Sequence, residues 1–149
     1  MIDSSVMQKY SLFDGLENDQ IEKILSLMEE ESYDAGTEII TEGSHNCKIY
    51  FILEGRVAAI KGGIILQELD EGAIFGEMEV LDVRPSAATV MAKAATKVMI
   101  LSIDALGEIY ETDIKTYSFI IMNLARDLSR KLRRLDGVLV CESPPTDWS

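Results

Sequence analysis

The chain is poor in the residues that metal centres and nucleophilic catalysis require. Its 149 residues include one histidine, His45, and two cysteines, Cys47 and Cys141, which flank no recognisable pattern. A jelly-roll metalloenzyme of the cupin type needs two or three histidines with a carboxylate, and a serine or cysteine nucleophile is commonly activated by a histidine base. A single histidine argues against both classes, so we expect no enzymatic activity, no metal and no tightly bound cofactor.

Long apolar runs and positive charge are also scarce. The longest unbroken apolar run is Ile49 to Leu53, far below the roughly 18 residues that indicate a transmembrane helix. The first residues, MIDSSVMQKY, lack the basic and apolar regions of a secretory signal. These absences predict a cytoplasmic protein without a membrane segment. The chain has 14 Lys and Arg against 26 Asp and Glu, a net charge of −12. This balance disfavours nucleic-acid binding, because such binding depends on neutralising phosphates.

The middle of the chain consists of short β-branched and aromatic runs separated by glycines. Many short strands with frequent turns favour a β sandwich or jelly roll, and Lys61-Gly62-Gly63 is typical of a tight hairpin. The sequence therefore predicts a mainly β fold, a jelly roll (double-stranded β-helix) over residues 33–102. Its expected strands are Glu38–Ile40, Ile49–Leu53, Arg56–Ile60, Ile64–Leu69, Thr89–Ala92 and Lys97–Leu101.

Helices are expected on both sides of this β region. Asn18 is a candidate N-cap, followed by apolar residues at helical spacing. Residues 103–136 are expected to form two further helices, the first capped by Ser102 and the longer second one beginning after Thr112-Asp113.

The sequence predicts a single domain over residues 1–149. The last stretch, residues 137–149, contains two prolines and is expected to be a tail. This tail has no room for a helix-turn-helix domain, so we expect no direct reading of DNA by the chain.

A continuous apolar stripe marks the longer C-terminal helix. Further apolar residues, including Ile120, lie outside the stripe in the first half of the helix, so the helix needs partners on two sides. We expect one partner to be the jelly roll and the other to be the same helix of a second subunit, which predicts a homodimer. The alternative is a monomer whose stripe packs back on the jelly roll. The predicted dimer helix uses Tyr117, Ile121, Leu124, Leu128, Leu132 and Leu135.

Residues 69–92 carry the strongest functional signal. In Phe75-Gly76-Glu77, the glycine lets the backbone approach a ligand closely. A short helix beginning nearby would point free N–H groups at an anion, and Glu77 is able to accept a hydrogen bond from a sugar hydroxyl. The segment therefore predicts a binding site for a small anionic ligand.

Together with these residues, three other segments resemble the cyclic-nucleotide-binding domain of the catabolite-activator and protein-kinase-regulatory-subunit superfamily. The resemblance covers roughly residues 12–135 and rests on LFDGL at 12–16, YFILEGRV at 50–57, FGE at 75–77 and AATV at 87–90. It implies a jelly roll with an N-terminal helix, a short phosphate-binding helix after FGE and a long C-terminal helix. It also implies a non-enzymatic regulatory role in signal transduction, with a cyclic nucleotide as ligand.

By the same resemblance, the backbone at Gly76 would face the cyclic phosphate, and Glu77 would bind the ribose 2′-hydroxyl. The family's phosphate-pairing arginine directly precedes the AATV-like segment, where this chain has Ser86; Arg84 lies two residues earlier, across Pro85. Losing the charged partner of a buried phosphate costs about 2–5 kcal/mol, which predicts a degenerate phosphate site. The expected pocket residues are Phe75, Gly76, Glu77, Met78, Arg84, Ser86, Ala87 and Ala88.

The last helix meets the base in this family, and Ser129 and Lys131 are the candidate contacts. The alternative for Lys131 is a lysine in the dimer seam whose ammonium reaches out to solvent. Three functions stay open at this point: binding of another small molecule, a ligand-free interaction with a protein partner, and true cAMP or cGMP binding rescued by Arg84 or by Lys131 of a second subunit. A chain of this kind would also suit the sensor part of a catabolite-activator-like transcription regulator.

Overall fold

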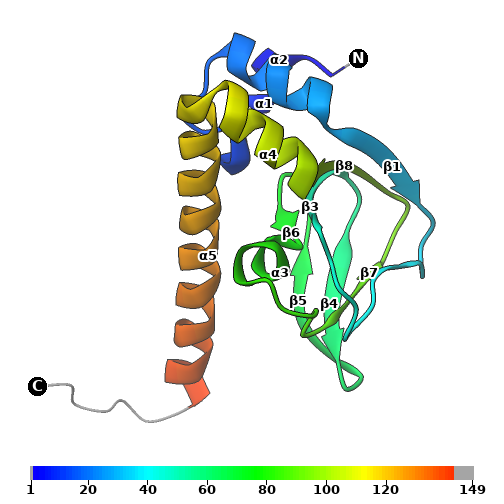
Figure 1. Cartoon of the computed structure of the whole chain (residues 1–149). Coiled ribbons are helices and arrows are strands. Elements are labelled where there is room, and N and C mark those ends of the chain that lie inside the picture. Colours follow the sequence, from blue (N-terminus) through cyan, green and yellow to red (C-terminus); the bar gives the residue numbers. More distant parts are fainter. Residues whose placement is uncertain (1, 143–149) are drawn as a thin grey trace, which may run out of the picture.

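The computed structural model describes the backbone of residues 2–142 and the side chains of residues 2–134. Two four-stranded antiparallel sheets face each other, with the strand orders β1-β8-β3-β6 and β2-β7-β4-β5 (Figure 1). The mainly β architecture with flanking helices that the sequence predicts is confirmed. The strands are β1 (Glu29–Tyr33), β2 (Glu38–Ile40), β3 (Lys48–Glu54), β4 (Val57–Lys61), β5 (Ile64–Leu69), β6 (Ile74–Phe75), β7 (Thr89–Ala92) and β8 (Thr96–Ser102).

Helices precede and follow the sheets, and one short helix interrupts them. In Figure 1, α1 and α2 lie at one end of the molecule beside α4, and α5 runs down one side, with α3 between it and the sheets. The helices are α1 (Ser4–Met7), the 3₁₀ helix η1 (Ser11–Phe13), α2 (Asn18–Leu27), α3 (Glu77–Asp82), α4 (Ile103–Thr112) and α5 (Ile114–Glu142). No helix in the described part of the chain is long and apolar enough to span a membrane.

Strand β3 divides the apolar interior into two cores. It lies between β8 and β6 and is buried on both faces, because alternate side chains of a strand point to opposite faces. Ile49 and Phe51 pack with the helices, whereas Tyr50 and Ile52 pack between the two sheets. The helical side of the first core is completed by Leu12, Phe13, Ile21, Ile24, Leu106, Ile109, Ile120 and Leu124.

Two strands escaped the sequence prediction. β1 is an edge strand that carries three consecutive glutamates and is almost fully exposed, so it shows no alternation of apolar and polar residues. β6 has only two residues, Ile74 and Phe75, which pair with β3. The jelly roll consequently begins at Glu29 instead of residue 33.

The predicted cap at Ser102 is confirmed, and α5 begins directly after Asp113, whose side chain caps it. The Ser102 hydroxyl accepts a hydrogen bond from the Ala105 N–H at 3.1 Å, and Asp113 Oδ1 accepts one from the Thr116 N–H at 3.1 Å. Such side-chain oxygens satisfy N–H groups that have no partner within the helix.

Two helix boundaries differ from prediction. Asn18 is the first residue of α2 and not its N-cap; the N-cap is Glu17, whose N–H donates to Gln20 Oε1 at 2.9 Å. At the other end, α5 continues past Gly137 to Glu142, so part of the predicted tail is helical. One internal glycine costs a helix only about 1 kcal/mol, so Gly137 does not end α5. The rest of the predicted tail lies outside the described residues.

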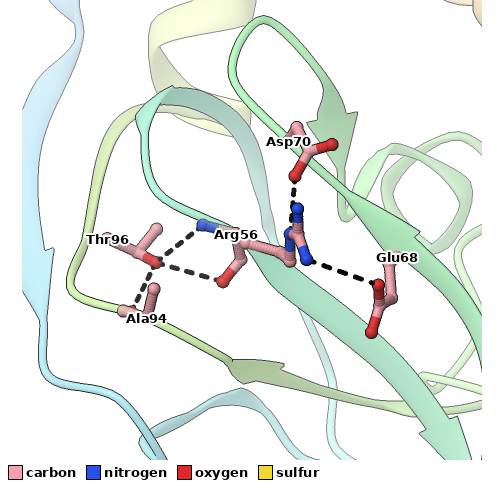
Figure 2. A network of polar contacts seen from close by, with 5 residues as sticks. All are labelled: Arg56, Glu68, Asp70, Ala94 and Thr96. Carbon is pink, nitrogen blue, oxygen red and sulfur yellow. Dashed lines mark hydrogen bonds and ion pairs between the residues drawn. The ribbon is translucent and has the colours of Figure 1, made fainter.

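The turn between β3 and β4 belongs to the YFILEGRV segment and depends on a buried threonine (Figure 2). Gly55 has a φ of +105°, and a Cβ there would lie 2.5 Å from Thr96 Oγ1. The Thr96 hydroxyl accepts from the Arg56 N–H at 3.3 Å and lies 2.8 Å from the Ala94 carbonyl oxygen, to which it donates. On the outside, the Arg56 side chain contacts Asp70 at 2.9 Å. The end of the motif therefore fixes a turn, whereas its first residue, Tyr50, pairs with Phe75 in the FGE segment.

Candidate functional site

The FGE turn brings β6 to the start of α3. Gly76 adopts φ +82° and is buried, and a Cβ at this position would lie 2.7 Å from the Lys48 carbonyl oxygen. Asn46 Nδ2 donates to the carbonyl oxygens of Gly76 at 3.0 Å and of Lys48 at 2.8 Å. Only glycine fits this left-handed, crowded position, and the backbone that it packs against belongs to the start of β3.

Glu77, the first residue of α3, is buried with 1% of its surface exposed and points at helix α5. The Lys131 ammonium on α5 donates to Glu77 Oε1 and to the Ile74 carbonyl oxygen, the latter at 2.8 Å. Burial raises the pKa of Glu77, and the Lys131 charge opposes that rise. The carboxylate proposed for a sugar hydroxyl therefore has a resident partner, which comes from the other end of the chain.

A second carboxylate on α5 shares the same ammonium. Asp127 Oδ2 lies 3.1 Å from Lys131 Nζ, one helical turn away, although the angle does not make it a hydrogen bond. Both side chains are about nine-tenths buried. One buried cation thus meets two buried carboxylates, which leaves the cluster of Glu77, Asp127 and Lys131 with a net negative charge when both acids are ionised.

Ser86 and Glu79 meet where the sequence places the phosphate site. Ser86 is 4% exposed, and its hydroxyl lies 2.8 Å from Glu79 Oε1 and 2.7 Å from the Ala88 carbonyl oxygen. Because a hydroxyl has one hydrogen, it donates to one of these acceptors at a time. The Ser86 backbone is held as well: its N–H donates to the Ser44 carbonyl oxygen and its carbonyl accepts from the Gly43 N–H, both at 2.8 Å. Here a carboxylate faces the position at which an anion would bind.

A model of the cyclic nucleotide-binding domain family matches residues 30–113, which include both sheets and the FGE turn. The chain belongs to the cyclic nucleotide-binding domain family. The resemblance inferred from the sequence motifs is therefore confirmed.

Known relatives of this cyclic nucleotide-binding domain include regulatory proteins. It is 33% identical over 81 residues to a cAMP-dependent protein kinase regulatory subunit of Yarrowia lipolytica, covering 54% of this chain and 22% of the relative. It is 29% identical over 135 residues to the cyclic AMP receptor protein of Thermus thermophilus, covering 87% and 61%. The chain thus spans less than two thirds of each of these proteins.

Among solved structures, a cyclic nucleotide-binding domain from Methylobacillus flagellatus matches with a TM-score of 0.85. The two share 24% sequence identity, and the match covers 97% of this chain and 84% of the other. At this identity the similarity establishes the jelly-roll fold.

The structure separates the two candidate base contacts on α5. Ser129 is exposed, whereas Lys131 points inward and its side chain is 9% exposed. The interpretation of Lys131 as a lysine that reaches out to solvent is therefore wrong. The helical wheel placed it beside an apolar seam but gave no information on the buried acid, Glu77, that draws it inward.

The other predicted pocket residues divide into three groups. Phe75 is a core residue that stacks on Tyr50 with ring centroids 4.7 Å apart. Met78 and Ala87 are exposed. Arg84 has 78% of its side chain exposed and pairs with Asp82 at 3.3 Å. In this conformation Arg84 does not replace the missing phosphate partner, because its guanidinium is exposed and pairs with Asp82.

Helix α5 presents two different faces to its surroundings. Leu124, which we placed in the dimer stripe, is fully buried in the first core together with Ile120. The outward stripe consists of exposed Ile114, Met122 and Leu132 and half-buried Tyr117, Ile121 and Leu128; Leu135 lies outside the described side chains. The core also takes polar Asn123, whose amide donates to the Leu12 carbonyl oxygen at 2.8 Å.

Sequence reasoning missed the positioning roles of Asn46 and Asp127 and the contact between Glu79 and Ser86. Glu79 lies in the first turn of α3, two residues after Glu77. Asp127 had a signal in its spacing, four residues before Lys131 on one helix face. Asn46 gave no signal, since its contacts with Gly76 and Lys48 depend on the folded loop.

Proposed function

We propose that this domain is a non-enzymatic regulatory module whose pocket no longer takes a cyclic nucleotide as its main ligand and serves another small molecule or a protein partner. The observation that carries the proposal is the contact between Glu79 and Ser86 at the expected phosphate position. A phosphate there would lose a charge-assisted hydrogen bond worth about 2–5 kcal/mol. It would also meet a carboxylate, and like charges in a partly buried site repel each other.

The ribose side of the pocket supports the same proposal. A sugar hydroxyl reaching Glu77 must displace the Lys131 ammonium, which is held by Glu77, Asp127 and the Ile74 carbonyl oxygen. Displacement from Glu77 breaks one contact of a buried ion pair, and the ammonium keeps Asp127 and the Ile74 carbonyl oxygen as partners. Any ligand of this pocket therefore competes with a contact that the protein already makes.

This competition supplies a mechanism for regulation. Lys131 and Asp127 belong to α5, while Glu77 belongs to α3. A ligand that binds Glu77 favours the conformation in which Lys131 has moved away from Glu77. The ligand shifts the equilibrium between the two positions of α5 by an amount set by its difference in affinity for the two conformations. The pocket and the long helix are thus coupled through one ion pair.

Calorimetric titration with cAMP and cGMP tests the proposal. We expect no binding by the natural chain up to millimolar nucleotide. The double variant Glu79→Ala/Ser86→Arg should gain affinity, because it removes the carboxylate and restores a phosphate partner. The matched control, Glu108→Ala/Ala35→Arg, makes the same change in net charge at exposed positions outside the candidate site and should gain nothing.

Micromolar binding by the natural chain would refute the proposal. The domain would then be a genuine cAMP- or cGMP-binding regulatory domain, a function that the names of its relatives favour. Because the chain covers 61% of the Thermus thermophilus receptor protein, that outcome would also favour the sensor part of a transcription regulator.

We further propose a homodimer formed through the outward stripe of α5. Ile114, Met122 and Leu132 expose 56%, 52% and 59% of their surfaces on a single helix, and an apolar stripe of this length suits pairing with the same helix of a second copy. Analytical ultracentrifugation should give a dimer for the natural chain and a monomer for Met122→Glu/Leu132→Glu. The control Lys115→Glu/Arg133→Glu changes exposed polar residues of the same helix and should remain dimeric.

A further inference from the structure

A cleft of about 820 Å³ lies where the N-terminal segment and α2 meet strands β1 and β8. Figure 1 shows these elements together at the end of the molecule that carries the N-terminus. The cleft shares no residue with the pocket around Glu77. We call this cleft the N-terminal groove. It is lined by Ile2, Asp3, Ser4, Glu22, Leu25, Ser26, Met28, Glu30 and Met99.

The base of the N-terminal groove is apolar. Met28 and Met99 are buried, Ile2 and Leu25 are half-buried on its sides, and the one buried polar residue of the lining, Ser4, lies with its hydroxyl 3.4 Å from Glu22 Oε1. Glu30 pairs with Met99 in the register of β1 and β8, so the two side chains lie on the same face of the sheet. Methionine side chains are flexible and polarisable, and they adapt to apolar side chains of different shapes.

The rim of the N-terminal groove is acidic. Asp3, Glu22 and Glu30 are exposed, and no lysine or arginine belongs to the lining. None of the three forms an ion pair with a residue of the described chain. Asp3 accepts hydrogen bonds from the Ser5 N–H and hydroxyl at 2.9 and 2.8 Å, and these keep it ionised by lowering its pKa.

The surroundings extend this negative field. Glu29 and Glu31 flank Glu30 on β1 and are exposed, and β1 is an edge strand, so the groove opens at the edge of its sheet. Three carboxylates around an apolar centre, beside two further glutamates, repel nucleic acids and anionic lipids. The same field attracts a cationic partner and raises its association rate.

We propose that the N-terminal groove docks a basic amphipathic helix of another protein. An apolar centre with a polar, solvent-accessible rim is the anatomy of a protein interface, whereas a small-molecule site gathers polar groups within a mostly enclosed cavity. In helix-in-groove recognition, apolar side chains spaced three or four residues apart enter the groove. Here they would contact Leu25, Met28 and Met99, and flanking lysines or arginines would meet Asp3, Glu22 and Glu30.

The test uses a synthetic helix of about 18 residues, long enough to be helical in water, with leucine on one face and lysine on the other. Fluorescence anisotropy of the labelled peptide measures its affinity for the full chain. A peptide with glutamate in place of lysine is the control for charge. We expect the lysine peptide to bind with micromolar affinity and the glutamate peptide not to bind.

Three variants assign the binding to the groove. Glu22→Lys/Glu30→Lys reverses two rim charges and should weaken binding at least about tenfold, whereas Glu108→Lys/Glu111→Lys makes the same change on exposed positions of α4 and should leave it within about twofold. Ser26→Trp fills the groove without a charge change and should also weaken binding. Thermal unfolding confirms that each variant is folded.

Two results would overturn the proposal. If the lysine peptide does not bind the natural chain, the N-terminal groove is not a docking site for basic helices. If both charge-reversal pairs weaken binding equally, and Ser26→Trp leaves it unchanged, the peptide is attracted to the acidic surface as a whole and not to this groove.

Discussion

Removing the Lys131 ammonium provides the most direct test of the buried cluster that joins α5 to the pocket. Lys131→Met keeps the aliphatic part of the side chain but leaves Glu77 and Asp127 buried without a cation. Breaking a buried ion pair by removing one partner costs about 3–5 kcal/mol, a large share of the total of about 5–15 kcal/mol that holds a small domain folded. For a chain of this size, that loss lowers the melting temperature by about 6–20 °C.

The matching change at Glu77 should cost much less. Glu77→Gln removes the charge that burial destabilises, and Lys131 keeps the Ile74 carbonyl oxygen and Asp127 as partners. We expect a loss below about 1.5 kcal/mol, the usual value of a single hydrogen bond. In the double variant, Glu77→Gln should recover about 1–3 kcal/mol of the cost of Lys131→Met, the range of coupling between residues in direct contact.

The cost of Lys131→Met should also depend on pH. Burial raises the pKa of Glu77 above its unfolded value of 4.5, so the folded state prefers the protonated acid. The stabilising effect of that proton is fully present below about pH 4.5 and is lost as pH rises through the folded pKa. Without the Lys131 charge the folded pKa rises further, so the difference between Lys131→Met and the double variant should shrink as the pH falls from 7 toward 4.5.

Urea denaturation followed by circular dichroism gives all four free energies of the cycle. Lys115→Met, which removes an exposed lysine from the same helix, is the control and should change stability by less than about 0.5 kcal/mol. If Lys131→Met unfolds with the same free energy as the control, or if the effects of the two changes add within about 0.5 kcal/mol, the cluster does not hold α5 in place.

Three further predictions concern the backbone and one helix cap. Val83 adopts φ 55° and ψ 48° with 86% of its surface exposed, so Val83→Gly should raise the free energy of unfolding by about 1 kcal/mol; a lower urea midpoint would contradict this. Gly55→Ala places a Cβ 2.5 Å from Thr96 Oγ1 at φ +105° and should cost at least about 2 kcal/mol, a figure that an unchanged melting temperature would exclude. Hydrogen bonds from Thr116 lower the pKa of Asp113 below 3.8, so its contribution is present above that pH and is lost as pH falls through the folded pKa. The stability difference between the natural chain and Asp113→Asn should therefore shrink between about pH 5 and 2, and a constant difference would show that the cap does not depend on charge.

Local patterns in the sequence predicted most of the fold because the interactions behind them are local. The apolar runs of β3 and β8, the Lys61-Gly62-Gly63 hairpin and the caps at Ser102 and Asp113 are decided by neighbouring residues. Strand β1 escaped prediction for the opposite reason. Its glutamates give no pattern, and the strand exists because its backbone pairs with β8.

The candidate site could be predicted only in part. The motif FGE and the replacement at Ser86 were visible in the sequence, since each depends on residue identity at a known spacing. The carboxylate that faces Ser86 was not, because the contact between Glu79 and Ser86 requires α3 to fold back onto the start of β7. The outward orientation of the Arg84 side chain was not visible in the sequence either, because it depends on the path of the loop between α3 and β7.

The sequence alone determined the family, the jelly roll, the absence of a phosphate-pairing arginine and the amphipathic character of the last helix, because identity and periodicity along the chain are sufficient for these. The tertiary structure decided which way the last helix turns. Leu124 and Lys131 face the domain, although periodicity allowed them to face a second subunit. The reason is that a helix can bury either face, and the choice depends on the cost of leaving distant groups unpaired, here Glu77 on α3 and the Leu12 carbonyl oxygen that Asn123 binds.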